Sequence, residues 1–180
     1  MHQPSVKGVF LQGTQNAWWG HRFGGEMNEL RAYLLARLMW KPDLDWREER
    51  REFCAAYDGE EAGRIIEEYL DDVSAAFLKQ GIHGGTNRVD YSWITPRMFA
   101  RWYAYMEKAE SLAENDEMKK LVLIARLPIQ FTEANSTKDP QQRQDRLDAY
   151  LRSAQQLIGN VVMAEGVDHY VWAQSVGLKW

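Results

Sequence analysis

The stretch EEAGRIIEEYLDDVSAAFLKQ, residues 60–80, decides the fold because it carries the clearest pattern in the chain. Its apolar side chains recur every three or four residues, which is the spacing of one face of an α-helix. Gly59 and Gly81 flank the stretch and end the pattern on both sides. The apolar face consists of Ala62, Ile65, Ile66, Tyr69, Leu70, Val73 and Phe77. We therefore expect a helix over 60–80 that buries one face.

Similar patterns extend on both sides of this stretch. The predicted helices begin near Glu26, cover 46–57, begin after Thr95, cover 116–134 and begin after Asp139. The helix that ends at Trp40 is apolar on so many sides that we expect it to be buried. The charged pairs Arg50-Arg51 and Asp71-Asp72 are typical of solvated helix faces. The fold class that we expect is mainly α, a helical bundle-like domain of about six helices.

Only the first residues depart from this helical pattern. Val6 to Gln12 is a short apolar run that ends at Gly13, and such a run is typical of a buried strand. We therefore expect one or two short N-terminal strands and divide the chain into residues 1–25 and 26–180. Because a lone strand leaves its backbone groups unpaired, we expect it to pair with another copy or with strands upstream of Met1.

The composition excludes several classes of function. The 22 Lys and Arg residues against 26 Asp and Glu give a net charge of -4, whereas a nucleic-acid partner needs a basic face. The one cysteine, Cys54, excludes an internal disulfide and a multi-thiolate metal cluster. The apolar runs are shorter than the roughly 18 residues of a membrane span. Residues 1–30 lack the basic-then-apolar layout of a signal peptide.

The histidines do not indicate a metal site. None of the four (His2, His21, His83 and His169) belongs to a ligand spacing such as H-E-x-x-H. The sequence also lacks the G-x-S-x-G turn that carries a catalytic serine in many hydrolases. We therefore expect neither a metal nor another cofactor.

Polar and aromatic side chains concentrate between the predicted strand and the first predicted helix. The candidate binding residues are Gln12, Trp18, Trp19, His21, Arg22 and Glu26. This mixture suits a hydroxyl-rich ligand, since an indole offers an apolar face and one N–H donor. Two alternatives stay open: the indoles pack over the helical core, or the Glu26 carboxylate simply interacts with the helix dipole. Residues 12–26 are therefore a candidate binding segment, with both alternatives open at this point.

Three strings together resemble a known family. In chain order they are GVFLQG (8–13), ELRAYLLARLMWKP (29–42) and ARLPIQ (125–130). They resemble the C-terminal portion of an uncharacterised bacterial glycoside-hydrolase-like family, related to the α-glucuronidase and β-hexosaminidase barrels. In that family the first string is a late barrel strand, and the second is a helix that packs outside the barrel.

The resemblance implies that residues 1–25 are a late barrel strand with its substrate-side loop, the remnant of a (β/α)8 barrel. It implies that residues 26–180 are an α-helical C-terminal domain. A barrel of this type needs roughly 200 residues or more, so most of it would precede Met1. The partners that we expect are therefore a carbohydrate and either the missing barrel segment or a second copy of the chain.

The activity that the resemblance implies is the hydrolysis of a polysaccharide or oligosaccharide. Trp18 and Trp19 would stack on sugar rings, and Arg22 would bind a carboxylate or hydroxyl. Glycoside hydrolysis needs two carboxyl groups about 5–9.5 Å apart, and the family places its acid on earlier strands. No catalytic residue is therefore assigned, and whether the chain by itself is an enzyme stays open.

Two further readings of the sequence stay open. The chain is either a noncatalytic helical module that interacts with a partner or with itself, or a carbohydrate-binding module without catalysis. The family resemblance implies a periplasmic or extracellular protein, although these 180 residues carry no signal peptide.

Overall fold

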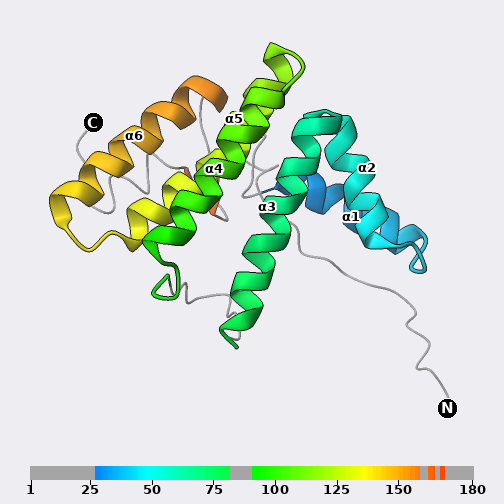
Figure 1. Ribbon diagram of the computed structural model, residues 1–180, viewed down its shortest axis with the longest axis horizontal. Helices are drawn as coiled ribbons and strands as arrows, with labels where there is room; N and C mark the ends of the chain where they lie inside the picture. The colour runs from blue at the N-terminus through cyan, green and yellow to red at the C-terminus, as the bar shows by residue number, and fades with distance from the viewer. Residues whose placement is uncertain (1–26, 82–90, 159–161, 165–166, 169–180) are drawn as a thin grey trace.

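The computed structural model describes residues 27–81, 91–158, 162–164 and 167–168, and these residues are mainly α-helical (Figure 1). A short antiparallel strand pair, β1 (Val162–Ala164) and β2 (Val167–Asp168), follows the last helix. The helices are α1 (Asn28–Trp40), α2 (Trp46–Asp58), α3 (Glu60–Lys79), α4 (Pro96–Leu112), α5 (Asp116–Ser136) and α6 (Pro140–Ile158). The prediction of a mainly α fold with about six helices is confirmed for the described residues. The N-terminal strands and the boundary at residue 25 lie outside the described residues.

Local sequence signals set several of the helix ends. The Asp45 carboxylate accepts a hydrogen bond from a backbone N–H in the first turn of α2, at 2.9 Å. The Thr95 hydroxyl does the same for α4 at 3.3 Å, and Pro96 takes the first helical position, where a missing N–H costs nothing. Gly59 separates α2 from α3 with a φ of 92°, which few other residues adopt. α5 continues through Pro128 without dividing.

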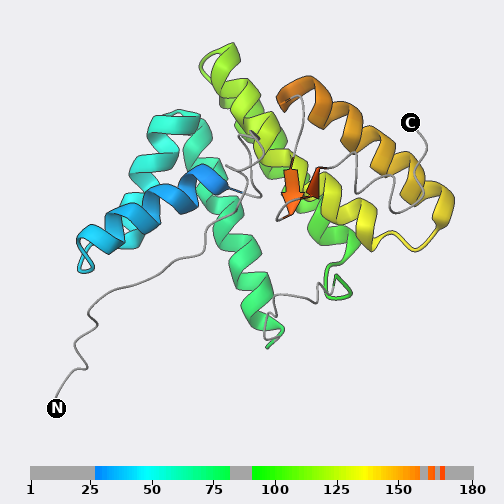
Figure 2. The same ribbon diagram turned by 180° about the vertical axis from the view of Figure 1, so that it is seen from behind.

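Helices that are adjacent in the sequence also pack side by side in the structure. α1 and α2 form an antiparallel hairpin at one end, and α6 lies at the opposite end in both views (Figures 1 and 2). Between them, α3 packs on α2 and α4, and α5 packs on α4 and α6. This order makes the α1–α2 hairpin an outer element of the described structure.

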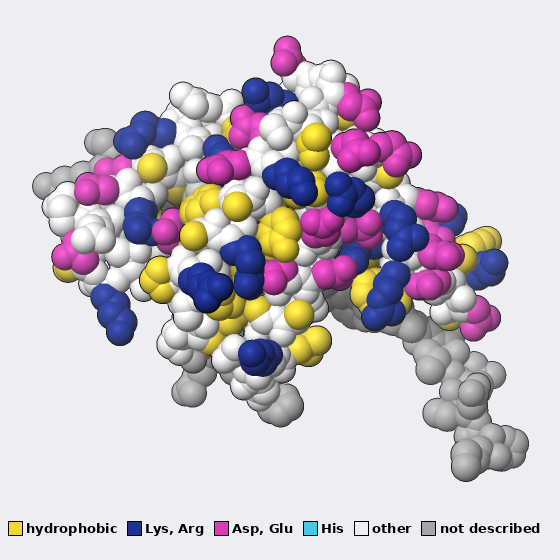
Figure 3. Space-filling model, viewed as in Figure 1, with side chains coloured by type: hydrophobic (Ala, Val, Ile, Leu, Met, Phe, Trp, Pro, Cys, Tyr) yellow, Lys and Arg dark blue, Asp and Glu magenta, His cyan; other side chains and the backbone are white. Residues whose placement is uncertain are grey.

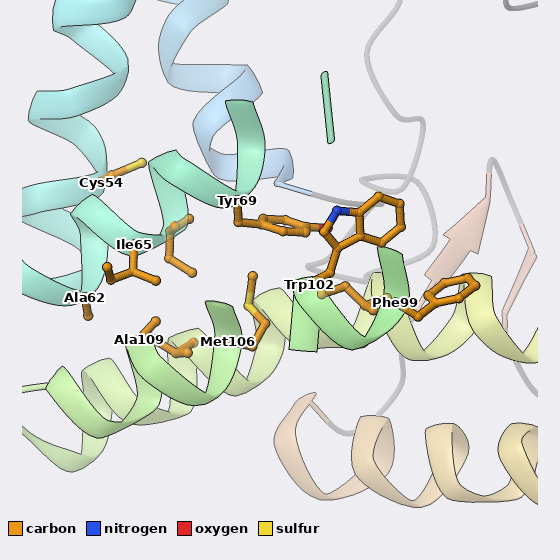
Figure 4. Packing of buried hydrophobic residues seen from close by; sticks show 11 residues of the cluster. Cys54, Ala62, Ile65, Tyr69, Phe99, Trp102, Met106 and Ala109 are labelled. Atoms are coloured by element: carbon orange, nitrogen blue, oxygen red, sulfur yellow. The ribbon is translucent and has the colours of Figure 1, made fainter. Parts of the chain in front are cut away.

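The main core lies where α2, α3, α4 and α5 meet (Figure 4). The face predicted from residues 60–80 is confirmed in its first half, since Ala62, Ile65, Ile66 and Tyr69 are at most 2% exposed. The Tyr69 ring meets Trp102 edge to face, with centroids 6.4 Å apart. Each large side chain buried in this way contributes about 1.5–3 kcal/mol to stability.

A glycine lets α2 and α3 approach closely. A Cβ atom at Gly63 would lie 2.3 Å from the backbone carbonyl oxygen of Cys54. That separation is far below van der Waals contact, so the two helices can pack at this distance only because residue 63 has no side chain. Cys54 itself is 1% exposed at this contact.

A second, smaller cluster joins α5 to α6. Its buried members are Leu127, Ala134, Leu147, Tyr150, Leu151 and Ala154. The Tyr103 hydroxyl of α4 donates to Glu133 of α5 at 2.8 Å, and Arg146 of α6 pairs with the same carboxylate. One carboxylate therefore ties three helices together beside this cluster.

The prediction that the charged pairs on α2 and α3 are solvated was wrong for two of the four residues. Arg50 is 8% exposed and donates to Glu67 and Asp71 of α3. Asp72 accepts from Arg101 at 2.9 Å and from the Trp102 indole N–H at 2.8 Å. Arg50 therefore joins α2 to α3, and Asp72 joins α3 to α4.

Candidate functional site

The predicted contact residues Gln12, Trp18, Trp19, His21, Arg22 and Glu26 all lie outside the described residues. Their arrangement around a ligand therefore stays a prediction. The structure does describe the helical base that they join, which starts at Met27. This residue has left-handed backbone angles (φ 48°, ψ 40°), and its side chain packs against the main core. The segment that precedes it is thus attached to a fixed point.

The inner face of α1 is anchored firmly to α2. Leu30 is 6% exposed, and the Tyr33 ring packs against Phe53 with centroids 5.3 Å apart. The Arg37 guanidinium binds the Glu49 carboxylate through two parallel hydrogen bonds of 2.6 and 2.9 Å. The Tyr33 hydroxyl donates to the same carboxylate at 3.0 Å. Two-pronged pairs of this kind fix orientation as well as distance.

These contacts shift the ionisation of all three partners. Hydrogen bonding from Arg37, and then from Tyr33, holds the pKa of Glu49 below its usual range. The same carboxylate raises the pKa of Arg37. Burial and the bond to Glu49 raise the pKa of Tyr33. All three groups therefore keep their ordinary charges near neutral pH and act as a structural tie.

This tie explains part of the ELRAYLLARLMWKP string. Tyr33 and Arg37 belong to the string, and both turn inward to Glu49, which lies outside it. The sequence did not reveal the pairing because the partners are 12 and 16 residues apart. Two polar members of the string, Tyr33 and Arg37, thus hold α1 and α2 together.

The first turn of α1 lies beside the last turn of α2. The Tyr57 ring stacks on Phe53 with centroids 5.0 Å apart, which extends the aromatic row that begins at Tyr33. Burial raises the pKa of Tyr57, and the charges of Glu29 and Asp58 raise it further, so these three groups are neighbours. Residues 12–26 therefore join the helices at an end that is rich in carboxyl groups.

The outer face of α1 corrects the expectation that this helix is buried. Leu35 is 43% exposed and Met39 is 54% exposed, and Ala32 and Ala36 on the same face are also exposed. The Trp40 side chain at the end of the helix is 93% exposed. α1 is apolar on two faces but only one of them has a partner among the described residues, because only α2 packs closely on it.

Two kinds of site are absent from the described part of the chain. Within 27–81, 91–158 and the two strands, no three His, Cys, Asp or Glu side chains are placed to hold a metal ion. The helices described there include none that is both long and apolar enough to cross a membrane.

Residues 1–71 match a family model described as a domain of unknown function, DUF4838. The matched part includes residues 12–26, the α1–α2 hairpin and more than half of α3. Neither the curated proteins nor the solved structures include a match to this chain. The relation to glycoside hydrolases therefore rests on the sequence resemblance.

Proposed function

We propose that this chain is the C-terminal helical portion of a glycoside-hydrolase-like protein that acts on a polysaccharide or oligosaccharide. Residues 12–26 contact the carbohydrate, and the helices hold that segment in place. The chain contributes substrate contacts rather than a complete catalytic pair, since glycoside hydrolysis needs two carboxyl groups about 5–9.5 Å apart and none is assigned here.

The observation that carries the proposal is the free apolar face of α1. This face contains Leu35 and Met39, and Trp40 extends the exposed surface at the end of the helix. A helix that buries one apolar face on α2 and keeps a second one free suits a position between α2 and a further body of protein. The resemblance places the ELRAYLLARLMWKP helix outside a barrel, and this face supports such a placement.

The proposed contacts follow from the chemistry of residues 12–26. Trp18 and Trp19 present flat apolar surfaces on which a sugar ring stacks. Arg22 binds a carboxylate or a hydroxyl, and the polar side chains beside it accept or donate hydrogen bonds.

Isothermal titration of the chain with neutral and uronic-acid oligosaccharides tests these contacts. We expect saturable binding that is lost in Trp18→Ala or Trp19→Ala. Trp40→Ala is the matched control, since it removes an exposed indole outside the predicted segment and keeps binding. Arg22→Ala should weaken uronic acids more than neutral sugars. A folded chain that binds no sugar, or that loses binding equally in the Trp40 variant, contradicts the proposed contacts.

A second candidate function is noncatalytic self-association, which the same free face of α1 favours. In that case the outer face of α1 packs on a second copy of the chain, so that Leu35 and Met39 are covered in the dimer. Sedimentation velocity over a range of protein concentrations separates the two candidates. Association that disappears in Leu35→Gln supports self-association. A monomer at every concentration rules self-association out, and the barrel then remains the proposed partner of the outer face of α1.

A further inference from the structure

A buried carboxyl group occupies the corner where α2 turns into α3. Asp58 is the last residue of α2 and is 5% exposed. The other buried charged residues in the described structure, Glu49 and Arg50, have partners of opposite charge. For Asp58, in contrast, no hydrogen-bond donor of the described residues reaches the carboxyl oxygens. Burying a carboxylate without a donor is costly, so this site favours the protonated acid.

The charged and titratable groups around the corner do not offset this cost. Acidic side chains gather where α2 meets α3 and where α4 meets α5 (Figure 3). Cys54 and Tyr57 of α2 lie within electrostatic reach of Asp58, Glu29 of α1 lies within reach of Tyr57, and Glu114 before α5 approaches Gly59. The first turns of α3 and α5 add the acidic residues Glu60, Glu61, Asp116 and Glu117 to this end of the helices. The carboxyl end of α2 adds its own negative partial charge.

The nearby cations are engaged with other carboxylates. Arg64 of α3 pairs with Glu61 and Glu68, and Lys119 of α5 pairs with Glu110. The helix start of α3 offers free backbone N–H groups, but none of them donates to Asp58. Burial accordingly raises the pKa of Asp58 to about 7.

The corner is also a close packing contact. At Gly59, the residue after Asp58, an added Cβ atom would lie 3.0 Å from the Met118 sulfur and 3.4 Å from a Glu114 carboxyl oxygen. The α4–α5 turn therefore rests directly on the connection between α2 and α3. Separation of these two parts would give water fuller access to an ionised Asp58.

We propose that Asp58 makes this corner a pH-dependent contact. With the carboxyl group neutral, the corner closes on the α4–α5 turn; when the group loses its proton, the contact opens so that water can solvate the carboxylate. The proposal does not depend on carbohydrate binding.

Hydrogen exchange of the whole chain at pH 6 and pH 8.5, corrected for the intrinsic pH dependence, tests the proposal. For peptides that span residues 55–63 and 113–120, we expect corrected exchange to rise roughly tenfold or more at the higher pH. Asp58→Asn should abolish the rise. Asp43→Asn, which alters an exposed carboxyl group in the α1–α2 turn, should retain it. A rise that persists in Asp58→Asn, or its absence in the unaltered chain, overturns the proposal.

A second measurement covers the case in which Asp58→Asn does not fold. The carboxyl carbon of Asp58 in the unaltered chain can be titrated by NMR. A midpoint within one pH unit of 7 supports the proposal, and a midpoint near 4, the ordinary value for an aspartate, overturns it.

Discussion

The helices α1 and α3 are both rich in apolar residues, and they use them in opposite ways. α3 buries one face on α2 and α4 and covers its other face with charges such as the Arg64–Glu68 pair. α1 buries one face on α2, while its outer face exposes Leu35 and Met39. The large apolar side chain that α3 leaves exposed, Leu78 at 72%, lies in its last turn, whereas α1 exposes Leu35 and Met39 along its outer face.

This difference separates two roles within one domain. The helices around α3 supply stability, since they contain the main core. The α1–α2 hairpin supplies a surface for contact and lies at the start of the described chain, next to the predicted carbohydrate-binding segment. Substitutions should therefore reduce stability when they alter α3, and should reduce association when they alter the outer face of α1.

The largest effect on stability should come from the centre of α3. Ile65 is 0% exposed, so Ile65→Ala leaves a cavity and should lower the free energy of unfolding by about 2–5 kcal/mol. Urea unfolding followed by circular dichroism measures the change. Ser74→Ala, on the exposed side of the same helix, is the control and should change little. A similar loss in both variants would mean that the core does not lie on the Ile65 face.

The corner between α2 and α3 should make stability depend on pH. Burial raises the pKa of Asp58 from 3.8 to about 7, so the folded state holds a proton that the unfolded chain has released. The contribution of this group to stability is complete below about pH 4 and is lost as the pH rises through 7. Between pH 5 and pH 8 the loss is roughly 2–3 kcal/mol.

The comparison of the unaltered chain with Asp58→Asn isolates that contribution. In urea unfolding, we expect the free energy of unfolding of Asp58→Asn to rise relative to that of the unaltered chain between pH 5 and pH 8. The reason is that the asparagine side chain does not ionise. Asp43→Asn should follow the unaltered chain at both pH values. An equal difference between Asp58→Asn and the unaltered chain at the two pH values would show that Asp58 has an ordinary pKa.

A smaller loss of stability should follow from widening the contact between α2 and α3. Alanine is a better helix former than glycine, yet Gly63→Ala would place a methyl group 2.3 Å from the Cys54 carbonyl oxygen. We expect a net loss of about 1–3 kcal/mol in thermal or urea unfolding. Ala75→Gly measures the helix-propensity difference alone at an exposed position of α3. A gain in stability for Gly63→Ala would show that the helices are farther apart.

The smallest effect should come from the outer face of α1. Leu35→Gln and Met39→Gln replace exposed apolar side chains and should change the free energy of unfolding of this chain by less than about 0.5 kcal/mol. The same two substitutions should abolish any association that uses the face. A large loss of stability would mean that the face is already covered within the chain, and it would remove the contrast with α3.

The helices could be predicted from the sequence because each depends on neighbouring residues. The stripe that contains Ile65, the cap at Thr95 and the break at Gly59 act within a few residues, and all three were predicted. The start of α1 was placed near Glu26, and the described helix begins at Asn28 after a left-handed Met27. A left-handed residue at the start of a helix does not change the spacing of apolar residues, so the sequence pattern does not reveal it.

The interhelical ties could not be predicted in the same way. Glu49 and Arg37 are separated by 12 residues, and Tyr103 and Glu133 by 30, so their meeting depends on how the helices pack. The burial of Asp58 likewise results from the α4–α5 turn, which lies far along the chain. For α1, the sequence indicated apolar residues on many sides but gave no information about which of them a partner covers. The residues predicted to bind carbohydrate lie outside the described structure.

The close approach of Gly63 to Cys54 has a consequence for chemical labelling. The only thiol of the chain is 1% exposed, and burial raises its pKa to about 12, so the folded state contains almost no reactive thiolate. A thiol reagent can modify Cys54 only during the moments in which α2 and α3 separate. The rate at which Cys54 is labelled therefore reports how often α2 and α3 separate, without any engineered probe.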